Sequence, residues 1–423
     1  MPQSPNPTSE TLVLKFGGMS LATPENLRQA AQVVAEAHRR GHAVVVVVSA
    51  MGKTTDQLQD LAYSVSPAPN RRELDMLLST GERVSMALFS MALNDHLGAR
   101  GIGEAISFTG SQAGVLTDAT HSSARITDVR ATRVRDELAA GHVVVIAGFQ
   151  GVNPHTKEIT TLGRGGSDVT AVAMAAHLSE LGPSSTPRLV ACEIRKEVPG
   201  VMTADPKLVP EARLLTELTH AQLLEMCFWG AKVLHYRSVE LATLAHVTLK
   251  VVLATSAAPS QHGTRIHTGE SMFQFETDRL LALNSIRDIV RVNAPQAETT
   301  AALVAIRQAL DAERLPRPQI LETQMRGSHT EFLLTAPSEA LEAQLKALTA
   351  QGFRVEAERL ALIAATCVGS FSSDLISDLA LELQQAQVKV HGVLTSPMSL
   401  SFLVAPRDLD RGLKALHARL LKA

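Results

Sequence analysis

A run of five valines, residues 44–48, is the feature that most restricts how this 423-residue chain can fold. A continuous apolar run of this length, preceded by Gly41, is typical of a strand buried on both faces, and such strands belong to parallel sheets covered by helices on both sides. Other β-branched runs, at 11–16, 143–146 and 188–192, alternate with Ala/Leu-rich helical patterns such as 24–39. The first part of the chain is therefore predicted to be an α/β domain with a mainly parallel sheet.

Composition excludes several classes of protein. Lys and Arg total 40 against 42 Asp and Glu, aromatic residues are only 3%, and no basic run offers a footprint for nucleic acid. No apolar run reaches membrane-spanning length, and the polar, Pro-rich residues 1–10, expected to be disordered, do not form a signal peptide. The chain has three widely spaced cysteines, Cys192, Cys227 and Cys367. They indicate reduced thiols, with no disulfide framework or zinc site. We expect a cytoplasmic chain with no nucleic-acid or membrane partner.

The pattern changes after residue 254. Residues 255–272 are rich in Ser, Ala, Pro, Gly and Thr and are predicted to be a linker. Beyond them we expect strands at 280–292, 319–324, 331–335 and 353–357, with helices at 298–313 and 338–349. A second set follows: a helix at 373–385, strands at 388–394 and 400–404, and a helix from Leu409. The predicted organisation is thus a domain at 11–254 and two α+β (βαββαβ) modules in 273–423, at about 273–357 and 358–423, with an interleaved arrangement left open.

A glycine-rich turn, Gly163-Arg164-Gly165-Gly166-Ser167-Asp168, combines flexible backbone with a guanidinium, a hydroxyl and a carboxylate. Glycines allow positive φ and bring N–H groups close to a ligand, and a helix expected at 168–178 would direct its positive end at the same place. Ser167 or Asp168 is expected to cap this helix. The arginine favours an anion because its planar fork suits carboxylate or phosphate. The alternative is a capped turn without a ligand.

A lysine turn, Lys15-Phe16-Gly17-Gly18-Met19-Ser20, follows the first expected strand. A lysine beside two glycines can approach a phosphoryl group and neutralise its charge, although a solvated lysine before an unliganded turn is the alternative. Residues 49–56 follow the valine strand at its carboxyl end, where open α/β sheets bind ligands. Neither glycine-rich turn matches the Walker A loop or the dinucleotide-binding fingerprint, so a different phosphate-handling scaffold is required.

Taken in order, the motifs between Lys15 and Ala242 resemble the aspartate kinases of the amino-acid kinase superfamily. The resemblance rests on these blocks: Lys15-Phe16-Gly17-Gly18, Val48-Ser49-Ala50-Met51-Gly52-Lys53-Thr54-Thr55-Asp56, Ser79-Thr80-Gly81-Glu82, Thr109-Gly110-Ser111-Gln112-Ala113-Gly114, the run 147–151, Ile159-Thr160-Thr161-Leu162 leading into the Gly163 turn, Thr203-Ala204-Asp205-Pro206, Gly230-Ala231-Lys232-Val233-Leu234-His235, and Arg237-Ser238-Val239-Glu240-Leu241-Ala242.

The resemblance implies a three-layer αβα kinase domain followed by two ferredoxin-like ACT modules. It implies transfer of the ATP γ-phosphoryl group to the β-carboxylate of L-aspartate, giving 4-phospho-L-aspartate, the first step toward threonine, methionine and, in many organisms, lysine. Mg²⁺ would accompany ATP, and no tightly bound cofactor is implied. A homodimer through the ACT modules and an effector, lysine or threonine, are also implied.

Carried onto matching positions, the resemblance assigns roles to individual residues. Lys15 and Asp168 would be catalytic. L-Aspartate would bind to Thr55, Glu82, Arg164, Gly165, Gly166 and Ser167, with Arg164 on a carboxylate and Glu82 on the ammonium. ATP would bind to Lys15, Gly17, Gly18, Ser20, Lys196, Glu197, Met202, Asp205, Lys207, Lys232 and Val233, and no protein metal ligand is implied.

Four of these residues have a plain structural alternative. Thr55 could be a helix N-cap, Glu82 a first-turn helix residue, Asp205 part of a simple turn before Pro206, and Lys232 a solvated lysine at a helix end.

The nucleotide side departs from the family pattern. The usual Thr-Asp pair is replaced by Lys196-Glu197, and further departures occur at Met19, Arg195, Met202, Lys207 and Tyr236. We expect altered ATP affinity or nucleotide choice with the aspartate pocket retained. A catalytically weak regulatory paralogue and a kinase for another acidic amino acid, such as glutamate, are the alternatives.

The ACT resemblance is weaker, because the loops at 284–288 and 368–373 lack the usual signatures. Feedback inhibition by lysine or threonine is a hypothesis, and a dimerisation module without an effector is its alternative.

Overall fold

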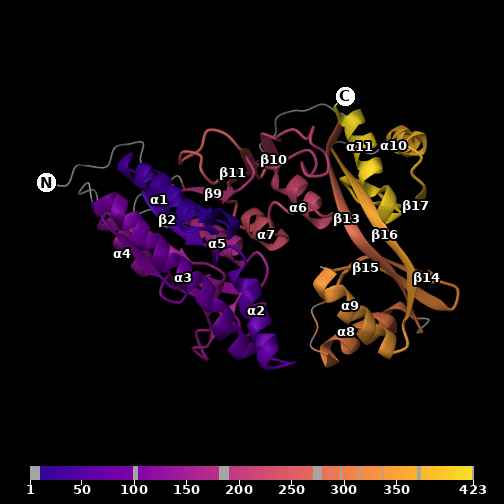
Figure 1. Ribbon diagram of the computed structural model, residues 1–423, viewed down its shortest axis with the longest axis horizontal. Coiled ribbons are helices and arrows are strands. Elements are labelled where there is room, and N and C mark those ends of the chain that lie inside the picture. Colours follow the sequence, from indigo (N-terminus) through magenta and orange to yellow (C-terminus); the bar gives the residue numbers. More distant parts are fainter. Residues whose placement is uncertain are drawn as a thin grey trace. The chain divides into compact units, whose positions relative to one another are not determined.

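The computed structural model describes residues 10–98, 103–180, 190–269, 279–295, 298–313, 315, 317–336, 338–368 and 373–421. The disorder expected for residues 1–10 thus falls, apart from Glu10, outside the described residues. The chain forms two compact units: the first comprises residues 1–201, 214–227 and 232–272, and the second comprises 202–213, 228–231 and 273–423 (Figure 1). None of the described helices has the length and apolar character needed to cross a membrane.

An eight-stranded sheet forms the centre of the first unit, in the order β10-β12-β11-β9-β1-β2-β6-β3. The strands are β1 (Thr11–Phe16), β2 (Ala43–Val48), β3 (Ala105–Phe108), β6 (Val143–Ala147), β9 (Val190–Lys196), β10 (Glu217–Thr219), β11 (Leu249–Leu253) and β12 (Thr264–His267). Neighbouring strands are parallel except β11 and β12. The predicted mainly parallel sheet is confirmed, and the segment expected as a linker contributes β12 to it.

The strand order turns at β1, which lies between β2 and β9. The chain runs outward from β1 through β2 toward one edge of the sheet and later through β9 toward the other. Such a reversal leaves a crevice beyond the carboxyl ends of the strands, where ligands of open α/β sheets bind. The lysine turn, which follows β1, is placed at this point.

Alternation along β1 directs its side chains to two different helix layers. Leu12, Leu14 and Phe16 share a core with apolar residues of α1 (Pro24–Arg39) and α3 (Arg71–Gly98). Val13 and Lys15 point to the opposite face, where α5 (Gly166–Glu180) contacts β1 and β9. The remaining helices of this unit are α2 (Thr54–Val65), α4 (Thr132–Ala139), α6 (His220–Phe228) and α7 (Tyr236–Leu244). The sheet is therefore covered on both faces, as its valine-rich strands require.

A smaller sheet carries the loops that surround the Gly163 turn. Its strands are β4 (Val115–Thr117), β5 (Ile126–Val129), β7 (Gln150–Val152) and β8 (Ile159–Thr161), in the order β5-β4-β7-β8. β8 ends at Thr161, two residues before Gly163, and α5 begins within the glycine-rich segment at Gly166. The helix thus starts two residues earlier than expected, so the prediction that Ser167 or Asp168 is its N-cap is wrong: both lie inside its first turn.

The second unit is built on a six-stranded antiparallel sheet in the order β14-β15-β13-β16-β18-β17. The strands are β13 (Arg279–Ala294), β14 (Gln319–Arg326), β15 (His329–Thr335), β16 (Arg354–Val368), β17 (Val390–Thr395) and β18 (Ser399–Val404). Helices α8 (Thr299–Ala312) and α9 (Ser338–Ala350) pack on one half of it, and α10 (Ser373–Gln385) and α11 (Leu409–Leu420) pack on the other (Figure 1).

The two halves of this sheet share their long central strands. β13 and β16 pair along most of their length, from Arg279 opposite Val368 to Asn293 opposite Arg354. β16 continues through residues 357 and 358, where the sequence indicated the end of one module. The α+β character expected for this part is confirmed, whereas its division into two modules stays a proposal.

Candidate active site

A buried ion pair lies at the carboxyl end of β1. The Lys15 Nζ is 2.6 Å from Oδ1 of Asp168, and the two side chains are only 6% and 5% exposed. Burial lowers the pKa of Lys15, because a charged ammonium loses its hydration, and Asp168 opposes this effect. Burial also acts to raise the pKa of Asp168, but the neighbouring lysines outweigh it and the net pKa is lowered. The carboxylate is therefore held ionised between cations.

Lys196 is the second cation beside Asp168. In the register of β9 with β1, Arg195 is opposite Phe16, so the next residue, Lys196, faces the α5 side of the sheet together with Lys15. Its Nζ is 3.5 Å from Oδ2 of Asp168. Two ammonium groups thus flank one carboxylate, which gives this edge of the sheet the charge that an anionic ligand requires.

Two polar residues beside this cluster, Ser20 and Glu197, are also in contact. Ser20 Oγ donates a hydrogen bond of 2.6 Å to Oε1 of Glu197. Both residues line a small cavity of about 140 Å³, which also includes Met19, Lys196 and the residues 253–255 that follow β11. The sequence-predicted nucleotide residues Lys15, Ser20, Lys196 and Glu197 therefore lie together.

Gly18 allows the lysine turn to contact the loop after β2. A Cβ on Gly18 would lie 2.7 Å from the carbonyl oxygen of Ala50, which no side chain tolerates. Gly52 N donates to the carbonyl oxygen of Gly18 at 2.8 Å. Glycine at position 18 is thus required by close backbone approach, and it fixes the turn beside residues 49–56.

Glu82 presents a buried carboxylate oxygen that lacks a partner. Its Oε1 accepts a hydrogen bond from Ala50 N at 3.0 Å, whereas no described residue donates to the buried Oε2. Burial raises the pKa of Glu82 to about 7. α3 begins at Arg71, so the alternative that Glu82 is a first-turn residue is wrong. A buried acceptor without a donor is a ready site for a cationic ligand group.

Thr55 lies half-buried in the first turn of α2. The helix begins at Thr54 and Lys53 occupies the N-cap position, so the alternative that Thr55 is the N-cap is wrong. Thr54 uses its own hydroxyl locally, donating to the carbonyl oxygen of Met51 at 2.6 Å.

The Gly163 turn has the backbone that its glycines predict. Gly163 and Gly165 have φ of +74° and +71°, the left-handed region that disfavours other residues. A Cβ on Gly165 would lie 2.2 Å from the Cβ of His235. Arg164 between them is exposed, whereas Ser167 is buried against Gly148. Because α5 starts at Gly166, the first-turn N–H groups are directed toward this turn.

Three residues near this turn were not identified from the sequence. Phe149 has a strained φ of +68°, and its N–H donates to Thr170 Oγ1 at 3.2 Å. The His235 ring lies against Gly165. Asp75 is a fully buried acid among the apolar residues 74–78 of α3. An acid inside an apolar run was the available signal for Asp75, whereas strain at Phe149 leaves no sequence signal beyond its flanking glycines.

Some predicted nucleotide residues belong to the second unit. Met202, Asp205 and Lys207 lie in the segment 202–213 of that unit. Asp205 Oδ1 accepts a hydrogen bond from Lys207 N at 2.9 Å, which makes a local turn of the kind that the structural alternative describes. Lys232 and Val233 lie in the loop between α6 and α7 rather than at a helix end, and Lys232 is exposed. A nucleotide role for these five residues stays a prediction.

Among the residues that the structure describes, no three His, Cys, Asp or Glu side chains are close enough together to hold a metal ion.

Comparison with known proteins gives consistent matches. A sequence profile of the amino acid kinase family matches residues 10–252. The aspartokinase of Corynebacterium efficiens is 39% identical over 424 residues, covering 96% of this chain and 95% of its own. Aspartokinase 2 of Bacillus subtilis is 36% identical over 413 residues, covering 96% of each chain. The solved structure of E. coli aspartokinase III in complex with aspartate and ADP has a TM-score of 0.73 at 22% identity, covering 97% of this chain and 100% of that one.

The buried state of Glu82 makes the stability of the chain depend on pH. An ordinary carboxyl with a pKa of 4.5 that rises to about 7 on folding binds protons more tightly in the folded state. Its contribution is then fully present below pH 4.5, falls as pH rises toward 7, and is lost above that value. We expect Glu82→Gln to remove this pH dependence and to stabilise the protein at pH 8 by on the order of 1–3 kcal/mol.

Urea unfolding of wild type and E82Q between pH 5 and 8 measures this difference. Glu73→Gln, which neutralises an exposed acid on the same helix, is the matched control and should leave the pH dependence unchanged. Parallel pH profiles for wild type and E82Q would contradict the raised pKa.

Proposed function

This chain belongs to the amino acid kinase family, and within it to the aspartokinases, and from this premise we propose that it transfers the γ-phosphoryl group of ATP to the β-carboxylate of L-aspartate. The products are ADP and 4-phospho-L-aspartate, which leads into amino-acid biosynthesis. The observation that supports this activity most directly is the buried Lys15–Asp168 pair, flanked by Lys196, at the point where the strand order reverses. Phosphoryl transfer needs fixed positive charge at such a place.

The amino-acid substrate is proposed to bind between α3 and the Gly163 turn. Glu82 Oε2, buried and without a donor among the described residues, is suited to the substrate ammonium. Arg164 is suited to a carboxylate because of its planar fork. Gly165 and Ser167 add N–H and hydroxyl donors at the positive end of α5, and Thr55 adds a hydroxyl from α2. Gly166 lets the backbone approach closely, while its own N–H donates to the carbonyl oxygen of Gly163.

The chemistry at the phosphoryl group then depends on position and charge. The acceptor β-carboxylate is ionised at neutral pH, so the enzyme needs no strong general base. Lys15 neutralises the charge that develops on the transferred group, and Asp168 fixes the Lys15 ammonium at 2.6 Å. Lys196 adds a second cation where the family pattern has an uncharged residue. Gly17, Gly18 and Ser20 allow close approach of phosphate oxygens beside Glu197.

Mg²⁺ is implied as the partner of ATP, and the carboxylates that could contact it are Asp168 and Glu197. Both oxygens of Asp168 face ammonium groups, and one oxygen of Glu197 accepts from Ser20. These residues fit an ion held mainly by nucleotide phosphates, which is the usual mode for magnesium. When bound, the ion supplies further neutralisation of phosphate charge.

By sequence position alone, the resemblance assigns a nucleotide role to Met202, Asp205, Lys207, Lys232 and Val233. Met202 lacks the ring and hydroxyl of the usual tyrosine, and Lys207 lacks the fork of the usual arginine. We therefore expect weakened ATP binding rather than loss of activity, because Lys15, Asp168 and Glu82 are all in place.

The second unit is proposed to be a pair of ACT modules, interleaved through β13 and β16, that dimerises the enzyme and binds an amino-acid effector. The shared strands and the separate helix pairs on each half of the sheet support this organisation. E. coli aspartokinase III has been solved in complex with lysine and aspartate, and its fold matches this chain with a TM-score of 0.69. The resemblance implies lysine or threonine as the effector here.

The proposed activity predicts ATP-dependent formation of an acyl phosphate, which hydroxylamine traps as a hydroxamate. With L-aspartate as acceptor and Mg²⁺ present, we expect turnover by wild type, little turnover with L-glutamate, and a loss of at least about 10³-fold in Lys15→Ala because a charge at the reacting group is removed. Lys196→Ala should be milder, about tenfold.

The exposed Lys157 provides a matched control, so Lys157→Ala should behave like wild type. Folded wild-type protein that forms no hydroxamate would contradict the kinase proposal and favour a regulatory paralogue. Greater activity on glutamate would instead favour a kinase for another acid.

The effector proposal predicts inhibition of the same reaction by lysine, by threonine or by both together. Binding at the second unit should stabilise that unit, so thermal melting should also shift upward with the inhibiting amino acid. A rate that stays constant with lysine, with threonine and with their mixture would contradict regulation and would leave a dimerisation role.

A further inference from the structure

Asp75 is a buried charge that the proposed mechanism does not use. It lies in α3, and its side chain is 0% exposed. A buried carboxylate is costly unless several donors surround it, so the elements that supply those donors show what Asp75 holds in place. Among the described residues, the His121 ring, which is mostly buried, lies against this carboxylate.

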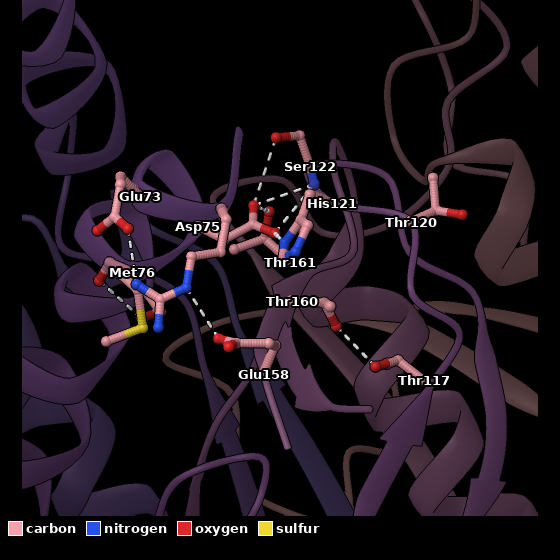
Figure 2. Close-up of polar contacts among 12 residues, drawn as sticks. Glu73, Asp75, Met76, Thr117, Thr120, His121, Ser122, Glu158, Thr160 and Thr161 are labelled. Carbon is pink, nitrogen blue, oxygen red and sulfur yellow. Dashed lines mark hydrogen bonds and ion pairs between the residues drawn. The ribbon is translucent and has the colours of Figure 1, made fainter. Parts of the chain in front are cut away.

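The donors come from two separate segments, as Figure 2 shows. Thr161 Oγ1 donates to Oδ1 at 2.6 Å, and His121 Nδ1 lies 2.7 Å from Oδ2. The backbone N–H of Ser122 lies 3.0 and 3.1 Å from the two oxygens, and its hydroxyl is 3.4 Å from Oδ1. One carboxylate therefore joins α3, the loop 118–124 and the end of β8.

The backbone of Ser122 is strained, and its N–H donates to Asp75. Its φ of +66° is in the left-handed region, which a residue with a side chain rarely adopts. The carbonyl oxygen of Ser122 lies 3.1 Å from the position of a Cβ on Gly163. The loop that Asp75 holds in this conformation thus forms one wall of the Gly163 turn.

Thr161 connects Asp75 to the same turn along the chain, since it ends β8 two residues before Gly163. At the next residue, Arg237 donates to the carbonyl oxygen of Leu162 at 2.5 Å, and it also donates to that of Ala124 at 2.8 Å. Two side chains, Asp75 and Arg237, therefore fix the backbone that leads into Gly163. Among the described residues, the hydrogen bonds and ion pairs of the Lys15–Asp168–Lys196 cluster do not involve Asp75 or its donors.

α3 also carries Glu82, seven residues after Asp75. Two helical turns separate the residues, so both side chains lie on one face, and both are buried. Between them the carbonyl oxygen of Ser79 accepts from Gln150 Nε2 at 2.9 Å. One face of α3 thus carries Glu82, which is proposed to contact the substrate ammonium, and Asp75, which supports the Gly163 turn.

We propose that Asp75 is a positioning residue for the acidic amino acid. It holds the Gly163–Arg164 turn in place relative to Glu82, so that the Arg164 guanidinium meets a carboxylate of the substrate and the Glu82 carboxylate meets its ammonium group. This inference rests on the proposed function. The hydrogen bonds around Asp75 do not include the Lys15–Asp168–Lys196 cluster. Loss of Asp75 should therefore weaken binding of L-aspartate while leaving ATP binding unchanged. It should also reduce discrimination between L-aspartate and the longer L-glutamate.

The test is Asp75→Asn in the full-length enzyme. Asparagine keeps the shape, but its amide nitrogen must face donors from Ser122 or His121, so the loop and turn should loosen. We expect KM for L-aspartate to rise at least about tenfold, KM for ATP to stay within about twofold, and kcat to fall by less than KM rises. Glu73→Gln, on the exposed side of α3, should match wild type.

A second pair of variants keeps the inference testable where D75N fails to fold. Thr161→Val removes one donor to Asp75, and Thr161→Ser retains the hydroxyl. We expect T161V to raise KM for L-aspartate selectively and T161S to restore it. The thermal shift produced by L-aspartate should shrink in T161V, whereas the shift produced by ADP should not.

Two results would overturn the inference. Unchanged KM values in D75N and T161V would mean that substrate binding does not need Asp75. Equal rises in KM for aspartate and for ATP, in both T161V and T161S, would mean that Asp75 contributes only to the general stability of the fold. Absence of both turnover and aspartate binding in wild type would instead refute the proposed function itself, before any variant is compared.

Discussion

The buried contact between Lys15 and Asp168 is the interaction on which the rest of the site depends. Two opposite charges lie at 2.6 Å with almost no exposure, so each would be costly to bury without the other. The sheet determines this contact, because alternation along β1 directs Lys15 to the face where α5 begins. The same register directs Lys196 of β9 to that face, and Asp168 then fixes two cations at the crevice.

Charge is divided between the two sides of the site in a way that fits phosphoryl transfer to an acidic amino acid. On the phosphate side, lysines keep Asp168 ionised and its pKa low. On the amino-acid side, α3 buries two acids, Glu82 and Asp75, in different surroundings. Glu82 has a raised pKa and a buried Oε2 without a donor among the described residues, so it can take a cationic group. The carboxylate of Asp75 instead accepts hydrogen bonds from residues of its own chain.

Sequence reasoning predicted regular elements well wherever one periodicity dominated. β1, α1 and β2 have the expected bounds, and α8, α9, α10 and the start of α11 agree within a residue or two. Sequence reasoning was less accurate where tertiary packing, rather than local periodicity, decides how far an element extends. α3 continues through Ser79 and Gly81 because its polar face is buried, so Glu82 lies far from the helix start.

Long-range contacts explain the other differences. Thr203 belongs to a sequence motif that resembles the kinase domain of the family. In the structure, however, its hydroxyl lies 2.9 Å from Nε2 of His417 on α11, and its carbonyl oxygen accepts a hydrogen bond from Leu283 N. The segment 202–213 therefore belongs to the second unit, which no local pattern indicates. Asp75 was missed for a similar reason, since its donors lie 46 and 86 residues away in the chain.

The turnover number of Asp168→Asn tests the central claim most directly. Asparagine keeps the size of the side chain but removes the charge that holds Lys15 and Lys196 in place. We predict that the variant folds, still binds L-aspartate within a few-fold of wild type, and loses at least about 10³-fold in kcat. A kcat within tenfold of wild type would contradict the account, because the two lysines would then hold their positions without the carboxylate between them.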